Sequence, residues 1–166
     1  IPVDDGTVIE VGAVRLTAIH TPGHTPEHIA WLAEDTRDPE GAPVLFSGDA
    51  LFAGDVGRPD LLGRERTQEL VDALYDTVTN VFKTMPDDTV VYPGHTAGSS
   101  CGKNIGSAPY TRIGLEKAMN YAFKPETREA FAEAVMSGMP DPPAYYPHLK
   151  KVNARGATPP DMLDDV

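Results

Sequence analysis

Three stretches of the chain share one pattern, a strand-like run that ends in a tight turn and is followed at once by a metal-ligand side chain. The turns and ligands are Thr21-Pro22-Gly23-His24, Ser47-Gly48-Asp49 and Tyr92-Pro93-Gly94-His95. Because a strand holds the residue at its end firmly and the turn directs the side chain out of the sheet, such positions are suited to presenting a metal site. We therefore predict that His24, Asp49 and His95 converge on a metal ion.

The composition limits the functions open to this chain. Its 166 residues, 40% hydrophobic and 23% charged, fit one globular domain or a large part of one. The formal net charge of -11 disfavours binding to nucleic acid or to an anionic membrane. No stretch is apolar over the roughly 18 residues that a transmembrane helix needs, so we expect neither partner. The single cysteine, Cys101, excludes an internal disulfide and, with no recognisable signal peptide, favours a cytoplasmic location.

Hydrophobic periodicity predicts an α/β chain. Alternating or short continuous apolar runs bounded by turn residues predict strands. Apolar residues at spacings of three and four predict helices, the clearest of which has Thr67 as its N-cap. The predicted strands are 7–11, 13–19, 29–33, 43–46 and 89–92, of which 29–33 and 43–46 are expected to be buried; the predicted helices are 67–85, 111–123 and 125–137; the predicted loops are 53–65 and 96–109.

The last part of the chain differs in composition from the rest. Residues 140–166 are Pro-rich and aperiodic, which predicts an extended tail or a linker toward a following domain. Residues 1–139 then belong to one structural unit. The chain begins with Ile1 rather than Met, so we expect that it is part of a longer protein or that a leader was removed.

Two imidazoles and one carboxylate restrict the metals that this site would take. Such ligands suit Zn, Fe, Mn or Ni, and a set without thiolate argues against a structural zinc. A facial triad of two histidines and one carboxylate with open positions is typical of non-haem Fe(II). His20 and His28 flank the first motif, and we interpret them as a turn-capping histidine and a pocket or surface histidine.

Taken together and in this order, the three motifs resemble the later metal motifs of the metallo-β-lactamase superfamily. Within it the sequence is most similar to the persulfide dioxygenases, especially those fused to a rhodanese sulfurtransferase. Three further stretches carry this similarity: Asp55-Val56-Gly57-Arg58-Pro59-Asp60, Gly98-Ser99-Ser100-Cys101-Gly102-Lys103 and the segment 146–153. The resemblance implies an αβ/βα sandwich, of which this chain is roughly the C-terminal half, with one mixed sheet and flanking helices.

The resemblance also implies a ligand set that this chain completes only in part. The first metal motif of the superfamily, His-x-His-x-Asp-His, would lie upstream of Ile1, so the N-terminal half of the domain is an expected partner. In persulfide dioxygenases two histidines and one aspartate hold the iron, which assigns His24 and Asp49 as ligands beside one upstream histidine. His95 would then be a pocket residue, or a ligand of the second metal as in dinuclear relatives. Fe(II) is the expected cofactor and Zn(II) the alternative.

The implied reaction is the oxidation of a low-molecular-weight persulfide, such as glutathione persulfide, by O2 to sulfite in sulfide detoxification. Arg58 would hold a substrate carboxylate or the forming sulfur oxyanion. Cys101 would carry or meet a persulfide sulfur, with Lys103 favouring its thiolate. In a plainer interpretation, Arg58 fixes its loop through an ion pair with Asp55 or Asp60. Cys101 is then an inert small residue.

Two other functions stay open. A zinc-dependent thioester hydrolase of the glyoxalase II type, a hydroxyacylglutathione hydrolase, would use the same motifs. Alternatively, the chain is a half-domain that only packs against its other half and carries no activity of its own. A homodimer is a further open arrangement.

Overall fold

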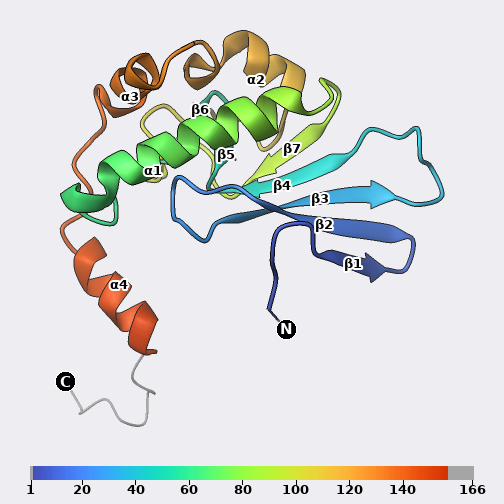
Figure 1. Cartoon of the computed structure of the whole chain (residues 1–166), viewed down its shortest axis with the longest axis horizontal. Coiled ribbons are helices and arrows are strands. Elements are labelled where there is room, and N and C mark those ends of the chain that lie inside the picture. Colours follow the sequence, from blue (N-terminus) through green and yellow to red (C-terminus); the bar gives the residue numbers. More distant parts are fainter. Residues whose placement is uncertain (1, 157–166) are drawn as a thin grey trace.

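The structure, a computed structural model, describes residues 2–156 and contains a six-stranded mixed sheet with helices packed on one face (Figure 1). The strands, in their order across the sheet, are β1 (Val8–Val11), β2 (Val14–His20), β3 (Ile29–Asp35), β4 (Val44–Gly48), β7 (Val90–Pro93) and β8 (Thr111–Arg112). β4 and β7 pair in parallel, and the other neighbours pair antiparallel. The predicted α/β class with one mixed sheet and flanking helices is confirmed.

The directions of the strands bring the three ligand motifs to one edge of the sheet. β2 and β4 are both antiparallel to β3, and β7 is parallel to β4, so β2, β4 and β7 run the same way. Strands that run the same way have their carboxyl ends at the same edge. His24, Asp49 and His95 each follow one of these ends.

A short hairpin follows Asp49 directly. Its strands are β5 (Leu51–Phe52) and β6 (Asp55–Val56), and all four residues are buried. The turn uses Gly54 at φ +78°, a left-handed conformation that glycine adopts without strain. The loop predicted over 53–65 is therefore shorter, because part of it is the second strand of this hairpin.

The helical elements follow the hairpin, and all but the last of them lie over one face of the sheet (Figure 1). They are α1 (Arg64–Asp76), a π-helical turn (Thr77–Val81), a 3-10 turn (Phe82–Thr84), α2 (Ile113–Met119), a second 3-10 turn (Tyr121–Phe123), α3 (Arg128–Met136) and α4 (Tyr146–Arg155). The first predicted helix is confirmed, but its predicted N-cap is wrong. The helix begins at Arg64, and the Thr67 hydroxyl donates to the carbonyl oxygen of Gly63 at 3.1 Å, from within the first turns. α3 does have a threonine cap, since the Thr127 hydroxyl accepts from the backbone N–H of Ala130 at 3.2 Å.

The core lies between the sheet and these helices. Alternate residues of the strands point to this side, and Ala30, Leu45 and Val91 are all fully buried there. They belong to one hydrophobic cluster with Leu74 of α1 and Phe82 of the turn that follows it. Full burial of each large apolar side chain stabilises the fold by about 1.5–3 kcal/mol.

The opposite face of the sheet, called the open face below, carries exposed apolar side chains. The register places Trp31, Phe46 and Tyr92 side by side across β3, β4 and β7. Phe46 is 48% exposed, and its ring stacks on that of Tyr92 with the centroids 6.0 Å apart. Further exposed apolar residues on this face are Ile9, Val11 and Val14 of the β1–β2 hairpin. The prediction that 43–46 is a wholly buried strand is therefore wrong for one of its two faces.

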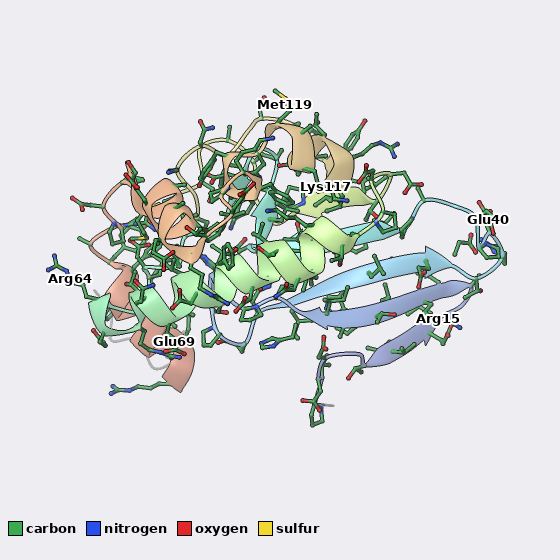
Figure 2. All side chains as sticks on the ribbon, turned by 45° about the horizontal axis from the view of Figure 1, so that its top comes forward. Arg15, Glu40, Arg64, Glu69, Lys117 and Met119 are labelled. Atoms are coloured by element: carbon green, nitrogen blue, oxygen red, sulfur yellow. The ribbon has the colours of Figure 1, made fainter. Side chains whose placement is uncertain are left out.

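Charged side chains lie on the outer surface of the helices and at the rim of the sheet (Figure 2). Arg64 and Glu69 project from α1 away from the sheet, and Arg15 and Glu40 lie toward the far end of the strands. Within residues 2–156, no helix combines the length and the hydrophobicity that a bilayer crossing requires.

The C-terminal segment departs from the sequence prediction. Residues 146–155 form α4 rather than an extended chain, and a proline in the first turn suits this helix start. The Tyr146 hydroxyl lies 2.6 Å from the Ser100 hydroxyl, which ties the start of α4 to the loop after β7. The rest of the predicted tail, 157–166, lies outside the described residues, and its role as a linker stays a prediction.

Two adjacent residues of β4 test the assignment of the two faces. Leu45→Ala should lower the free energy of unfolding of the 166-residue chain by about 2–5 kcal/mol, because it leaves a cavity in the core. Phe46→Ala should lower it by about 1 kcal/mol or less, because this ring is half exposed. Urea unfolding of the two variants measures the difference, and equal losses would contradict the assignment.

Candidate metal site

Asp49 lies between two histidines at the carboxyl edge of the sheet. Its Oδ2 atom is 3.5 Å from Nε2 of His24, and its Oδ1 atom is 3.2 Å from Nε2 of His95. The Asp49 side chain is 25% exposed, that of His24 is 9% exposed and that of His95 is 40% exposed. The structure thus brings the three sequence-predicted residues together, and metal binding by them stays a prediction.

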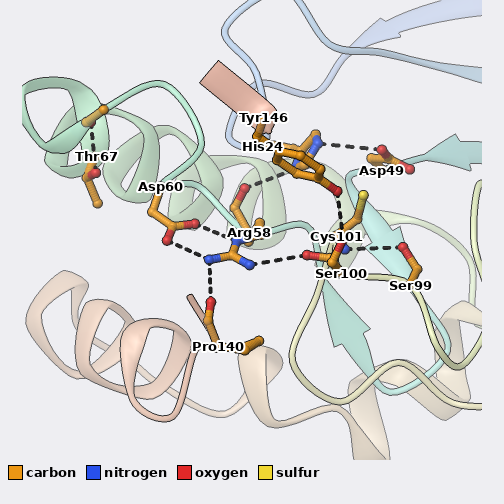
Figure 3. Close-up of polar contacts among 11 residues, drawn as sticks. His24, Asp49, Arg58, Asp60, Thr67, Ser99, Ser100, Cys101, Pro140 and Tyr146 are labelled. Atoms are coloured by element: carbon orange, nitrogen blue, oxygen red, sulfur yellow. Dashed lines mark hydrogen bonds and ion pairs between the residues drawn. The ribbon is translucent and has the colours of Figure 1, made fainter. Parts of the chain in front are cut away.

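A backbone contact on the side away from Asp49 fixes the orientation of the His24 ring. Its Nδ1 atom lies 2.9 Å from the carbonyl oxygen of Arg58 (Figure 3). A carbonyl oxygen only accepts, so Nδ1 carries a hydrogen, and Nε2 is the ring nitrogen that faces Asp49. Metal-ligating histidines are oriented in this way by a backbone carbonyl or carboxylate.

Glycines make room for the cluster. A Cβ atom at position 57 would lie 1.8 Å from the carbonyl oxygen of Asp49 and 2.9 Å from Cβ of His24. A Cβ atom at position 94 would lie 2.7 Å from Oδ1 of Asp49. The two imidazoles and the carboxylate can approach one another because Gly57 and Gly94 have no side chain. This donor set and its close packing fit a divalent metal ion.

Cys101 joins the cluster from the loop after β7. One ligand atom from each of His24, Asp49 and Cys101 lies within 4.8 Å of the other two. Burial raises the pKa of the Cys101 thiol; a hydrogen bond with Ser99 lowers it, and the charge of Asp49 raises it again. The protein alone therefore favours the protonated thiol, and a bound cation would favour the thiolate. Sequence reasoning had counted no thiol among the ligands, because only the loop's path brings Cys101 to the edge of the sheet.

The Arg58 side chain is fully buried and engaged with protein groups (Figure 3). Its Nε and Nη2 atoms donate to the two carboxylate oxygens of Asp60 at 2.7 and 2.8 Å. Nη2 also donates to the carbonyl oxygen of Pro140 at 2.7 Å, and Nη1 donates to that of Ser100 at 3.2 Å. In this conformation the guanidinium offers no surface to a substrate, contrary to the expected anion-binding role. The alternative, a loop-fixing ion pair with Asp60, is present.

The backbone of residue 58 joins two parts of the site. Its N–H donates to the carbonyl oxygen of Cys101 at 2.9 Å, while its own carbonyl accepts from His24. The guanidinium holds the neighbouring Ser100 carbonyl as well. Arg58 therefore sets the position of the Cys101 loop relative to the His24 ring.

Lys103 does not act on the thiol as expected. Its Nζ atom donates to the carbonyl oxygens of Ala134 and Ser137, the latter at 2.7 Å, and it lies 4.5 Å from the centroid of the Tyr121 ring. Lys103 thus joins the loop to α3, and the expectation that it favours the Cys101 thiolate is wrong.

Asp55, the other candidate ion-pair partner of Arg58, is a buried carboxylate that supports the site through different contacts. Oδ2 accepts from the backbone N–H of Asn104 at 2.6 Å, and Oδ1 accepts from the Tyr121 hydroxyl at 2.7 Å. Burial and the nearby carboxylate raise the pKa of Tyr121, so its hydroxyl stays a donor. A Cβ atom on Gly102 would lie 2.6 Å from Oδ2, so the glycine lets the loop close on Asp55. The glycines at the two ends of 98–102 were the sequence feature that could have indicated this close contact between the loop and Asp55.

The remaining histidines differ in their distance from the cluster. His28 contacts Asp49, since its Nε2 atom accepts from the backbone N–H of Asp49 at 3.0 Å. Burial, followed by the charge of His24, lowers the pKa of His28. His20 is exposed, and its Nε2 atom contacts the carbonyl oxygen of Pro26 at 2.8 Å. His148 is exposed on α4.

Comparison with known proteins connects this geometry to a family. A family model described as the metallo-beta-lactamase superfamily matches residues 1–95. The chain is 28% identical over 175 residues to a hydroxyacylglutathione hydrolase of Dictyostelium discoideum, covering 97% of this chain and 62% of the relative.

Two solved structures are also similar to most of this chain. A metallo-beta-lactamase from Staphylococcus aureus subsp. aureus COL has a TM-score of 0.80 and 38% identity, over 91% of this chain and 43% of that chain. ETHE1 from Myxococcus xanthus has a TM-score of 0.71 and 29% identity, over 92% of this chain and 59% of that chain. The chain thus spans between 43% and 62% of the lengths of these three relatives.

The Arg58–Asp60 ion pair should make the stability of the protein depend on pH. Burial alone would raise the pKa of Asp60, but the hydrogen bonds and charge of Arg58 outweigh it and hold that pKa below its ordinary value. Charged Asp60 therefore contributes stability above its unfolded pKa of about 4, and the contribution is lost as the pH falls through the lower native pKa. Asp60→Asn should lower the free energy of unfolding by about 1–3 kcal/mol at neutral pH, and the loss should shrink in acid.

Urea unfolding at about pH 7 and about pH 3.5 measures this effect across the Asp60 titration range. Asp88→Asn, a change at an exposed aspartate, is the matched control and should leave stability nearly unchanged at both values. A loss for Asp60→Asn that is independent of pH would contradict the ion-pair explanation.

Proposed function

The chain belongs to the metallo-β-lactamase superfamily, and from this premise we propose that the complete protein oxidises a low-molecular-weight persulfide with O2. The substrate would be glutathione persulfide or a similar molecule. The balanced reaction consumes one persulfide RSSH, one O2 and one water, and yields the thiol RSH and sulfurous acid, which ionises to sulfite. The outer sulfur of the persulfide is oxidised and O2 is reduced.

The proposed metal ligands of this chain are His24 and Asp49. The 3.5 Å approach of His24 Nε2 to Asp49 and the space left by Gly57 and Gly94 support this assignment. His95 lies on the other carboxylate oxygen and is either a pocket residue or a further ligand. One more histidine would come from polypeptide outside this chain. Fe(II) held there would supply redox chemistry and open positions for the reactants.

The observation that favours persulfide chemistry is the thiol of Cys101 beside His24 and Asp49. A thiol can take up the outer sulfur of a persulfide by exchange, in which RSSH and the Cys101 thiol give RSH and a Cys101 persulfide. No oxidant is needed for this step, because one S–S bond breaks and another forms. The transferred sulfur would lie next to the proposed ligands. Arg58 would act here by holding the Cys101 loop in place.

A thioester hydrolase is the second candidate. The Dictyostelium relative named hydroxyacylglutathione hydrolase supports it, since its similarity covers 97% of this chain. Zn(II) in the same site would activate water for attack on the acyl carbon of a thioester. His95, whose Nε2 atom lies 3.2 Å from Oδ1 of Asp49, would help to hold a second zinc ion. Both candidates act on sulfur compounds.

The open face of the sheet supports the proposal that the domain has another half. Phe46, Tyr92 and Tyr110 form a row of rings with centroids 6.0 and 5.8 Å apart, and each side chain is 43–51% exposed. Exposed apolar side chains that gather on one face of a protein mark an interaction site. We propose that an N-terminal half packs here, with a homodimer as the alternative occupant. A rhodanese domain beyond Val166 also stays a proposal.

Metal analysis and O2 uptake test the reaction. The complete purified protein should contain about one iron per chain and consume one O2 per glutathione persulfide, with sulfite as product. Asp49→Ala should lose the iron and the O2 uptake together, because it removes the residue between the two histidines. Two zinc ions per chain with no O2 uptake would reject the proposal, and thioester cleavage without O2 would select the hydrolase.

A change on the open face tests the packing. In the complete protein Phe46→Ala should cost about 3–5 kcal/mol of unfolding free energy, as for a buried aromatic side chain, whereas the 166-residue chain should lose about 1 kcal/mol or less. Leu45→Ala is the control, because its side chain is in the core in both cases. Equal costs of Phe46→Ala in the two proteins would show that the open face stays uncovered.

A further inference from the structure

We propose that His28 is a positioning residue of the metal site, which ties the loop carrying His24 to the turn carrying Asp49. The inference rests on the proposed metal site, but not on the reaction carried out there. His28 is the first residue before β3, and it lies between the two ligand-bearing segments. The roles assigned so far leave this ring unexplained.

Both nitrogens of the His28 ring have partners, and these fix its tautomer. Nε2 lies 3.0 Å from the backbone nitrogen of Asp49, whose N–H can only donate, so Nε2 accepts. Nδ1 lies 2.8 Å from the Thr21 hydroxyl. A neutral ring with an accepting Nε2 carries its hydrogen on Nδ1, so Nδ1 donates to Thr21. The ring thus transmits one hydrogen-bonded connection from Thr21 to the backbone of Asp49.

The Thr21 end of this connection closes the loop that holds His24. The backbone N–H of Thr21 donates to the carbonyl oxygen of His28 at 2.9 Å, and the fully buried Thr21 side chain contacts the same residue. In the sequence, His24 lies midway between Thr21 and His28. The ends of the loop are therefore joined through both backbone and side chain, which limits the positions that His24 can take.

The Asp49 end fixes a ligand through its own backbone. The turn reaches His28 because residue 48 is glycine, with φ at +52°, and a Cβ atom there would lie 2.7 Å from Nε2 of His28. The carbonyl of Gly48 in turn accepts from the N–H of Gly94 at 2.8 Å, next to His95. His28 therefore acts on the peptide that precedes the Asp49 carboxylate. Without that contact the turn can rotate, and the carboxylate moves relative to His24 and His95.

Four variants of the complete protein separate this role from simple packing. His28→Leu removes both ring contacts. His28→Gln keeps an acceptor at the distance of Nε2, whereas His28→Asn keeps a donor near Thr21 but does not reach Asp49. His20→Gln is the matched control, because His20 is the last residue of β2, directly before this loop, and contacts Pro26 rather than Asp49.

The readout is the affinity for Co(II), measured without O2 from its visible absorption bands in competition with a chelator. His28→Leu and His28→Asn should bind Co(II) about 10–100-fold more weakly than the unchanged protein, as for other partners behind a metal ligand. His28→Gln should recover most of the affinity, and His20→Gln should match the unchanged protein. Thermal unfolding of the metal-free proteins shows whether each variant is folded.

The outcomes distinguish this inference from the proposed reaction. If the affinities follow the expected order but no persulfide is oxidised, the reaction is wrong and the role of His28 stands. If folded His28→Leu binds Co(II) as tightly as the unchanged protein, or if Gln and Asn weaken binding equally, His28 is not a positioning residue. If the unchanged protein binds no Co(II), the metal site fails and this inference fails with it.

Discussion

The peptide of Arg58 is the constraint on which the candidate site depends most. Its carbonyl orients the His24 ring and its N–H holds the carbonyl of Cys101. The side chain of the same residue is buried against Asp60 and two backbone carbonyls. One residue therefore fixes a ligand from one loop and a thiol from another, and its ion pair keeps it in place. A charged group that is buried in this way needs such full pairing, because an unpaired charge inside a protein is costly.

The sheet performs two separate tasks. Its carboxyl edge presents His24, Asp49 and His95, because β2, β4 and β7 run the same way. Its two faces differ, since one is covered by α1 and its neighbours while the other carries exposed rings such as Phe46. A site at the edge of a sheet can receive ligands from polypeptide that packs on either face. The chain spans between 43% and 62% of the lengths of three relatives, so further polypeptide on the open face could reach the same site.

Some features could be predicted from local sequence, and others could not. Strands such as 13–19 and helix α1 follow from periodicity, which depends on neighbouring residues only. The N-cap at Thr67 was wrong because the turn before α1 is closed by Gly63, for which the pattern gave no signal. The extended tail was wrong for 146–155, since Pro at the start of a helix and Pro in an extended chain look alike in composition. The role expected for Lys103 was wrong because its long side chain turns toward the carbonyl oxygens at the end of α3, which local sequence does not reveal.

The sequence by itself determined which side chains are available at the ends of the strands, since a strand, a glycine turn and a ligand residue are contiguous at His24, Asp49 and His95. Only the tertiary structure decided how they are joined. The contacts that join Arg58 to Cys101 and His28 to Asp49 link segments far apart in the chain, and these contacts depend on strand direction and loop path rather than on spacing. Local patterns fix local conformation, but hydrogen bonds between distant segments form only when packing has brought these segments together.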